Sequence, residues 1–280
     1  MILMDGKNLQ LETIEELKLS VERLSPKPKL VIIQIGHDEP SNKYINQKKL
    51  IASKIGIDII HINYEEDVKE EEVLSKIDEY NIDKSVTGIM VQLPLPDKFN
   101  EEKIINRIDP IKDVDGITTT NIGKLFDNKE CFIPCTALGV MELIHKYNIK
   151  LEGKNVVIVG RSNLIGKPLI ACFLKENATV TVTHSKTVDL GSITSKADIL
   201  VVGVGKAHFI KEDMVKEGAI IIDVGTDFVD GVLTGDVDFE SVAPKASYIT
   251  PVPNGVGRMT VTSLMKNVII AYNTQKELNN

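Results

Sequence analysis

The sequence predicts an α/β protein of two domains that flank a cleft. Apolar strand-like runs alternate with helix-like runs along the chain, and this alternation indicates parallel sheets with right-handed crossovers. A long irregular stretch, residues 109–134, separates two sets of such elements. A strand, a glycine loop and a helix follow one another in residues 155–176, which indicates that the second domain is a Rossmann-type doubly wound parallel sheet.

The first predicted domain comprises residues 1–134, with residues 261–280 joining it from the end of the chain. Its strands are runs rich in Val, Ile and Leu, which suit the buried centre of a parallel sheet. The helices are bounded by polar starts and by glycine or proline stops. In order, the predicted elements are a strand at 29–36, a helix at 41–56, a strand at 57–62, a helix at 68–80, a strand at 85–93 and a short helix at 101–107.

The second predicted domain comprises residues 135–260, with a sheet of four or five strands. Thr136 is expected to cap its first helix. A strand starts at Asn155, a helix covers 169–176, and further strands are expected at 178–184, 198–203, 219–225 and 248–250. We expect the final helix, residues 261–272, to return to the first domain, and a cleft between the domains to bind the ligands.

The composition excludes several classes of protein. A net charge of −7 over 280 residues argues against a general nucleic-acid surface, because no basic excess exists to neutralise phosphates. The N-terminus lacks the apolar core of a signal peptide, and no stretch approaches a membrane span. Cys131, Cys135 and Cys172 are an odd, sparse set that indicates a reducing, cytoplasmic compartment. No nearby His or further Cys completes a zinc site, so no metal is predicted.

The glycine loop after the strand at Asn155 indicates a nucleotide site. Gly160 ends the strand and Gly166 opens the helix, so a pyrophosphate can sit at the positive end of that helix. Ser162 replaces the middle glycine of the usual motif, and the last glycine comes one residue late. A plain strand–helix crossover with a tight turn is the alternative.

The end of the next strand favours NADP over NAD. An NAD site usually has an acidic residue there for the ribose hydroxyls, but this chain has His184-Ser185-Lys186, with Arg161 just after the first glycine. Guanidinium, hydroxyl and ammonium groups together suit a 2′-phosphate. Alternatively, these are ordinary solvated residues.

Two segments of the first domain offer groups for chemistry. Tyr44 and Lys48 are four residues apart and share the apolar face of a predicted helix. Lys48 therefore either extends its ammonium to water or is desolvated, and desolvation would lower its pKa and make it a proton carrier. Gln92 ends a strand, and Asp115 lies in a loop with Asp113. Plain strand-end and turn-forming roles remain alternatives, and the D-x-D-G pattern fits a calcium loop poorly.

These residues and their surroundings carry a resemblance to a known family. SNKYINQKK, GIMVQLPLP, KDVDG, IPCTALGV, VGRSNLIGKP, HSKT, GDVDF and PVPNGVGRMT occur in the order found in the bifunctional methylenetetrahydrofolate dehydrogenase/methenyltetrahydrofolate cyclohydrolase family. The resemblance spans nearly the whole chain. It implies a one-carbon folate enzyme in which NADP takes a hydride from 5,10-methylenetetrahydrofolate and water then converts the methenyl product to 10-formyltetrahydrofolate. A cytoplasmic homodimer serving purine biosynthesis is implied as well.

The resemblance also implies site residues. Lys48 resembles the catalytic lysine, Tyr44 the ring that stacks on the folate, Gln92 the residue that orients the lysine, and Asp115 the carboxylate that holds the pterin. The implied cofactor residues lie in the second domain: Gly160, Arg161, Ser162, Gly166, Ser185 and Thr226.

Several positions depart from the family pattern. Asn254 and Arg258 stand where glycine and proline are usual, PCTALGV replaces PCTPKGV, and the segment around Thr226 replaces a GIN-like sequence. These changes leave open the balance of the two activities. The alternatives are an enzyme that retains only one of them, a non-catalytic folate- or NADP-binding protein, and another two-domain oxidoreductase such as a shikimate or amino-acid dehydrogenase type.

Overall fold

The computed structural model describes residues 1–278, and the chain divides into two compact units. The three-stranded unit comprises Glu12–Cys135 and the chain from Val261 onward. The six-stranded unit comprises Met1–Leu11 and Thr136–Thr260. The division falls within the first helix, α1 (Gly6–Glu22), and the last, α10 (Val256–Leu278).

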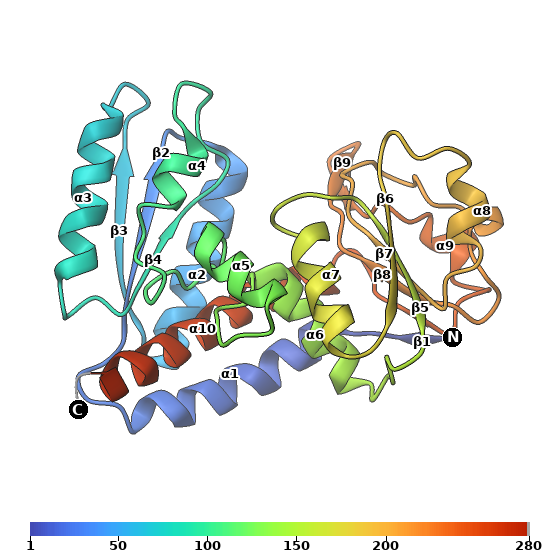
Figure 1. Ribbon diagram of the computed structural model, residues 1–280, viewed down its shortest axis with the longest axis horizontal. Coiled ribbons are helices and arrows are strands. Elements are labelled where there is room, and N and C mark those ends of the chain that lie inside the picture. The colour runs from blue at the N-terminus through green and yellow to red at the C-terminus, as the bar shows by residue number, and fades with distance from the viewer. Residues whose placement is uncertain (279–280) are drawn as a thin grey trace. The chain divides into compact units, whose positions relative to one another are not determined.

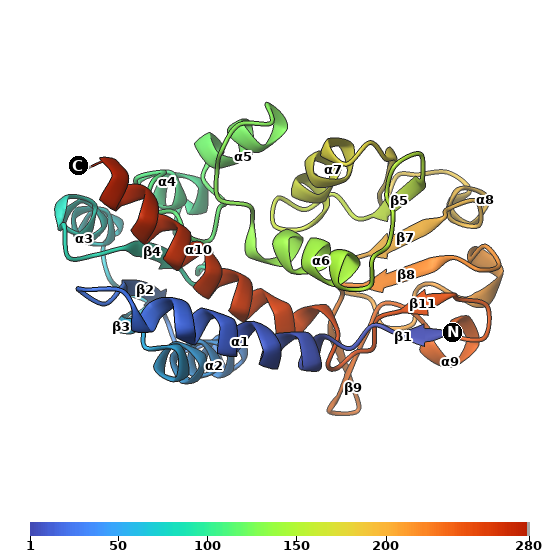
Figure 2. The ribbon, with the colours of Figure 1, turned by 90° about the horizontal axis from the view of Figure 1, so that it is seen from below.

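The three-stranded unit has a parallel sheet in the order β3-β2-β4. Its strands are β2 (Lys29–Ile35), β3 (Asp58–Tyr64) and β4 (Gly88–Val91), and its remaining helices are α2 (Glu39–Ile55), α3 (Glu70–Ile82), α4 (Glu101–Ile105) and α5 (Thr119–Phe126). In Figure 1, α3 runs alongside β3. Figure 2 shows α1 and α10 side by side in this unit.

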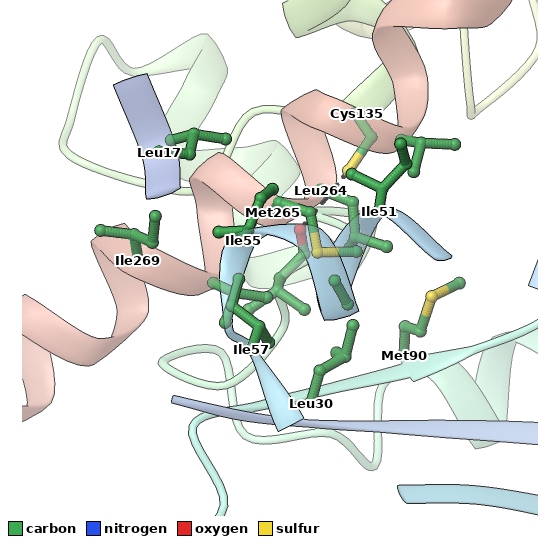
Figure 3. Packing of buried hydrophobic residues seen from close by; sticks show 14 of the residues in the cluster. Leu17, Leu30, Ile51, Ile55, Ile57, Met90, Cys135, Leu264, Met265 and Ile269 are labelled. Atoms are coloured by element: carbon green, nitrogen blue, oxygen red, sulfur yellow. Dashed lines mark hydrogen bonds between the residues drawn. The ribbon is translucent and has the colours of Figure 1, made fainter. Parts of the chain in front are cut away.

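Alternation along β2 builds two apolar layers, because successive side chains point to opposite faces. Leu30 and Ile32 join the cluster formed with α1, α2 and α10, whereas Val31, Ile33 and Ile35 join the cluster formed with α3 and α4. Figure 3 shows the first cluster, in which side chains of α2 and α10 meet those of β2 and β4. The predicted return of the last helix to this domain is confirmed.

Local signals define α2, the helix that carries the predicted lysine. Asp38 caps its start, where the carboxylate accepts the Ser41 amide at 2.9 Å. Gly56 ends it with a φ of +92°, a left-handed conformation that suits glycine. A buried stripe faces the core between these ends: Ile45, Lys48, Ile51, Ala52 and Ile55.

The six-stranded unit is a parallel sheet in the order β1-β11-β8-β7-β5-β6. Its strands are β1 (Ile2–Leu3), β5 (Asn155–Val159), β6 (Thr179–Thr183), β7 (Ile199–Val202), β8 (Ile220–Asp223) and β11 (Tyr248–Ile249), with a separate hairpin of β9 (Asp227–Val229) and β10 (Val232–Thr234). The helices are α6 (Cys135–Lys146), α7 (Gly166–Lys175), α8 (Leu190–Thr194), the 3₁₀ turn η1 (Glu212–Met214) and α9 (Phe239–Val242).

The predicted fold class is confirmed: both units are α/β, and the six-stranded sheet is parallel throughout. Several elements were not predicted. Helix α5 lies in the stretch expected to be irregular, α1 and the β9–β10 hairpin are additional, and α10 starts at Val256 and not at 261. The helix expected to be capped by Thr136 starts at Cys135.

The boundaries also differ at the N-terminus. Residues 1–11 were expected in the first domain, but the structure groups them with residues 136–260, because β1 pairs with β11. Within residues 1–278, no helix is both long and apolar enough to cross a membrane.

Candidate functional site

Helix α2 places Tyr44 and Lys48 one turn apart on the same side. The Tyr44 residue is 42% exposed, whereas Lys48 is only 7% exposed. Lys48 Nζ donates a hydrogen bond to Gln92 Oε1 at 2.7 Å, and Gln92 Nε2 donates to the Leu93 carbonyl at 2.7 Å. Since Gln92 directly follows β4, this bond joins α2 to the carboxyl end of the three-stranded sheet.

Lys48 adopts the desolvated arrangement and not the solvated one. Burial lowers its pKa, because the ammonium loses hydration, and the nearby negative charge of Asp115 opposes this change. A lysine of lowered pKa gives up its proton more readily than an ordinary lysine, which suits it to proton transfer.

The two aspartates in the loop after α4 have different surroundings and therefore different roles. Asp113 is fully buried, and its carboxylate accepts hydrogen bonds from the backbone N–H groups of Gly116, Ile117 and Thr118 and from Asn121 Nδ2. Asp113 therefore has the turn-forming role. Asp115 is partly exposed. Loss of hydration raises the pKa of the Asp115 carboxyl, while the positive charge of Lys48 lowers it.

Two residues missed by the sequence analysis support Asp115. The Cys135 thiol at the start of α6 donates a hydrogen bond to the carbonyl of Val114, the residue before Asp115, at 3.5 Å, and burial raises the pKa of this thiol well above its usual value. Asn267 of α10 is 1% exposed, and its Nδ2 donates to the carbonyls of Val114 at 2.9 Å and Ile133 at 3.0 Å. Asn267 thus joins the loop of Asp115 to the loop of Cys135. The sequence signal for Asn267 is a single amide side chain among the apolar residues of the buried face of the last helix.

The three-stranded unit therefore brings Lys48, Gln92 and Asp115 together, with Tyr44 one helical turn away. A proton carrier, a neutral amide and a carboxylate lie beside a partly exposed aromatic ring. This set can bind a flat heterocycle with N–H donors and move protons to or from it. In residues 1–278, no group of three or more His, Cys, Asp or Glu could hold a metal ion.

The glycine loop of the six-stranded unit has the close backbone packing of a nucleotide site. Gly160 has a φ of +121°, and a Cβ there would lie 2.4 Å from the Gly203 carbonyl oxygen. A Cβ on Gly166 would lie 2.3 Å from the Gly160 carbonyl oxygen. Both positions therefore require glycine, and Gly166 lets the start of α7 approach the end of β5 closely.

The remaining predicted cofactor residues lie at the carboxyl ends of parallel strands, where doubly wound sheets bind ligands. Arg161 and Ser162 follow β5, Ser185 follows β6, and Thr226 follows β8; all four are exposed. The Ser162 hydroxyl accepts the Ile165 amide at 3.2 Å, which shapes the loop before α7.

Two departures from the family pattern are bonded to each other. Asn254 has a φ of +81°, a conformation that asparagine tolerates better than most residues. Arg258 Nε donates to Asn254 Oδ1 at 3.1 Å. The arginine therefore stabilises the asparagine that replaces the usual glycine.

These two units match known domains. The catalytic-domain model of the tetrahydrofolate dehydrogenase/cyclohydrolase family covers residues 4–115, and its NAD(P)-binding-domain model covers residues 134–276. A bifunctional protein FolD from Oceanobacillus iheyensis is 49% identical over 273 residues, which cover 96% of each chain.

Solved structures agree with these matches. The bifunctional FolD enzyme of Campylobacter jejuni has a TM-score of 0.96 and 42% identity, over 98% of this chain and 99% of that one. The Trypanosoma brucei dehydrogenase-cyclohydrolase, solved with NADP and an inhibitor, has a TM-score of 0.93 and 32% identity, over 98% of both chains.

Fold and site together define an α/β enzyme with an NAD(P)-binding domain and a separate catalytic domain. The chain belongs to the tetrahydrofolate dehydrogenase/cyclohydrolase family. This membership confirms the predicted resemblance, the two predicted activities and NADP as the predicted cofactor.

Proposed function

We propose that Lys48 is the proton carrier with which this enzyme converts 5,10-methylenetetrahydrofolate, through the methenyl form, to 10-formyltetrahydrofolate. One observation carries the assignment: Lys48 is buried, hydrogen-bonded to the neutral Gln92 and close enough to Asp115 for their charges to interact. Its lowered pKa raises the fraction of neutral amine at any given pH, which favours proton transfer by this lysine.

Tyr44 and Asp115 bind the folate. The exposed Tyr44 ring offers a flat face on which a pterin can stack. The Asp115 carboxylate can accept hydrogen bonds from adjacent N–H groups of an aminopyrimidinone ring. Cys135 and Asn267 both donate to the Val114 carbonyl and so hold this loop before the substrate arrives.

The hydrolytic step needs three proton transfers. Water adds to the electron-poor methenyl carbon, and neutral Lys48 accepts the proton that the water loses. The carbon–N5 bond then breaks as N5 takes that proton from the lysine ammonium, the neutral amine accepts the remaining hydroxyl proton, and the formyl carbonyl stays on N10. The lysine later passes this proton to water, so the net reaction releases one proton. Gln92 keeps the amine oriented by accepting a hydrogen bond from it.

The residues of the six-stranded unit fit NADP. Gly160 and Gly166 leave space that a Cβ would fill, and the start of α7 offers backbone N–H groups to a pyrophosphate. Arg161 and Ser185, both exposed, would hold the 2′-phosphate, and Ser162 shapes the loop. The family resemblance implies that the segment of Thr226 would lie near the nicotinamide. When bound, NADP⁺ supplies the hydride acceptor for the dehydrogenase step.

Lys48→Met tests the central assignment, with Lys54→Met, an exposed lysine of the same helix, as the matched control. We expect Lys48→Met to abolish methenyl hydrolysis above the spontaneous rate and Lys54→Met to retain it. Unchanged hydrolysis in a folded Lys48→Met protein would refute the role of this lysine.

We also propose that the enzyme is a cytoplasmic homodimer whose formyl product serves purine biosynthesis. The family resemblance supports this, and Cys131, Cys135 and Cys172 form no disulfide in the described chain. Light scattering of the purified protein tests the dimer, and a monomer at micromolar concentration would contradict it.

A further inference from the structure

Two buried carboxylates in the six-stranded unit have no part in the roles described above. Asp223 at the end of β8 is 4% exposed and Asp236 after β10 is fully buried. Within residues 1–278, neither forms an ion pair with a lysine, arginine or histidine. Burying a carboxylate costs free energy unless other groups compensate its charge. Hydrogen bonds from backbone N–H groups supply this compensation for both side chains.

Asp236 binds three consecutive amides. Its carboxylate accepts hydrogen bonds from the backbone N–H groups of Val204 at 2.5 Å, Gly205 at 3.0 Å and Lys206 at 2.7 Å. A concave run of amides is an anion-binding arrangement, and here a side chain of the same unit is the anion. Hydrogen bonds to an ionised acceptor are about twice as strong as neutral ones, so the loop 204–206 is held firmly.

Asp223 fixes the segment that carries Asp236. Its carboxylate accepts the backbone N–H of Asp236 at 3.1 Å and that of Val237 at 2.9 Å. Two glycines leave room for the pair: a Cβ on Gly225 would lie 2.0 Å from the Asp236 carboxylate, and one on Gly235 would lie 2.0 Å from that of Asp223. The two aspartates and the two glycines therefore pack together as one cluster.

The loop held by Asp236 lies against the glycine loop. Gly203, which precedes it, has its carbonyl oxygen 2.4 Å from where a Cβ of Gly160 would be. The amides of Val224 and Gly225 donate to the Val202 carbonyl at 2.8 and 3.2 Å. The loop 204–206 thus lies at the carboxyl edge of the sheet, between the glycine loop and the segment of Thr226.

We propose that Asp236 is a positioning residue of the dehydrogenase, whose carboxylate holds the loop 204–206 in the conformation that receives NADP. This inference rests on the proposed cofactor site. Without the carboxylate, three amides lose their partner, and the loop must be ordered when the cofactor binds, which weakens binding. Methenyl hydrolysis consumes no NADP, so we expect a change confined to this loop to leave it nearly unaffected.

Asp236→Asn tests the proposal, because the variant keeps the size but replaces one acceptor oxygen by a donor. Asp198→Asn is the matched control: Asp198 accepts the Asn155 amide at 2.9 Å and binds Lys216 at the opposite end of the same sheet. We expect Asp236→Asn to raise the Kd and KM for NADP⁺ about tenfold or more, with methenyl hydrolysis in the absence of NADP⁺ and the KM for folate nearly unchanged. Asp198→Asn should leave the Kd for NADP⁺ unchanged.

An unchanged Kd for NADP⁺ in folded Asp236→Asn would overturn the proposal. So would a parallel loss of NADP-free hydrolysis, or an equal loss of NADP⁺ affinity in Asp198→Asn. Failure of the wild-type enzyme to oxidise methylenetetrahydrofolate with NADP⁺ would instead reject the proposed function.

Hydrogen exchange of the ligand-free wild type supplies a test that needs no variant. The amides of 204–206 lie outside any strand, yet the Asp236 bonds predict slow exchange, comparable to amides of β7. Exchange as fast as in an exposed loop would overturn the proposal even if Asp236→Asn does not fold.

Discussion

Replacing Gln92 by glutamate places a charge next to the proposed proton carrier with little change of shape. Lys48 Nζ lies 2.7 Å from Gln92 Oε1 and Lys48 is only 7% exposed. In the wild type, burial lowers the pKa of Lys48, and the amide partner adds no net charge to oppose this. A carboxylate at the same position favours the ammonium form and therefore raises that pKa.

The geometry sets the size of the effect. Two unit charges 2.7 Å apart attract by about 6 kcal/mol at an effective dielectric constant of about 20. Burying the new carboxylate offsets much of this, and an opposite charge this close typically moves a pKa by about one to three pH units. If neutral Lys48 accepts the proton from water, hydrolysis at neutral pH should fall by roughly 10- to 1000-fold.

The assay follows the loss of methenyltetrahydrofolate without NADP⁺ over a range of pH, corrected for spontaneous hydrolysis. We expect the acid limb of the profile for Gln92→Glu to move to higher pH, with activity recovering as pH rises. Gln92→Met, which is neutral, should lower activity without this movement. Acid limbs at the same pH in the wild type and Gln92→Glu would refute the role of Lys48 as the titrating group.

Three further expectations concern stability. Asn267→Leu removes the donor of the Ile133 carbonyl and leaves the Val114 carbonyl with only the weaker Cys135 thiol, so it should lower the unfolding free energy by about 1–3 kcal/mol; an unchanged urea midpoint would contradict this. Burial raises the pKa of Asp223 to about 7, with backbone N–H bonds opposing, so the folded state binds more protons than the unfolded state between about pH 4 and 7. The contribution of this group to stability is therefore lost as pH rises through that window. Asp223→Asn should flatten the plot of unfolding free energy against pH there, and an unaltered slope would show that Asp223 is not the titrating group. A double-mutant cycle of Asn254→Gly and Arg258→Ala should show a coupling of about 0.5–1 kcal/mol, and additive effects would show that their bond contributes nothing.

The main elements of both sheets could be predicted because their residues carry the signal locally. The run at Lys29–Ile35 is apolar on both faces, as a central parallel strand requires. The period of α2 placed Tyr44 and Lys48 on one side, and the structure keeps them there. Burial of Lys48 decided between the two interpretations of its environment, which periodicity alone left open.

Other features depend on partners far away in the sequence. Helix α5 is short and lies among turn residues, so its stability comes from tertiary contacts more than from propensity. Cys135 and Asn267 support Asp115 only because α6 and α10 bring them to its loop. No spacing in the sequence joins positions 115, 135 and 267. The helical spacing of the apolar residues Ile14, Leu17 and Val21 is a local signal that is sufficient to predict α1 from the sequence.

The pairing of β1 with β11 has a consequence for synthesis of the protein on the ribosome. Ile2 pairs with Tyr248, so the first strand to be made waits for a partner roughly 250 residues later, which takes about 12–50 s at typical elongation rates. The edge of β8 is open from its own synthesis until β11 follows about 25 residues later, which takes about 1–5 s at the same rates, since β11 must insert between β8 and β1. We therefore expect a nascent chain stopped before Tyr248 to be prone to pairing with other chains, and release of the complete chain to end that exposure.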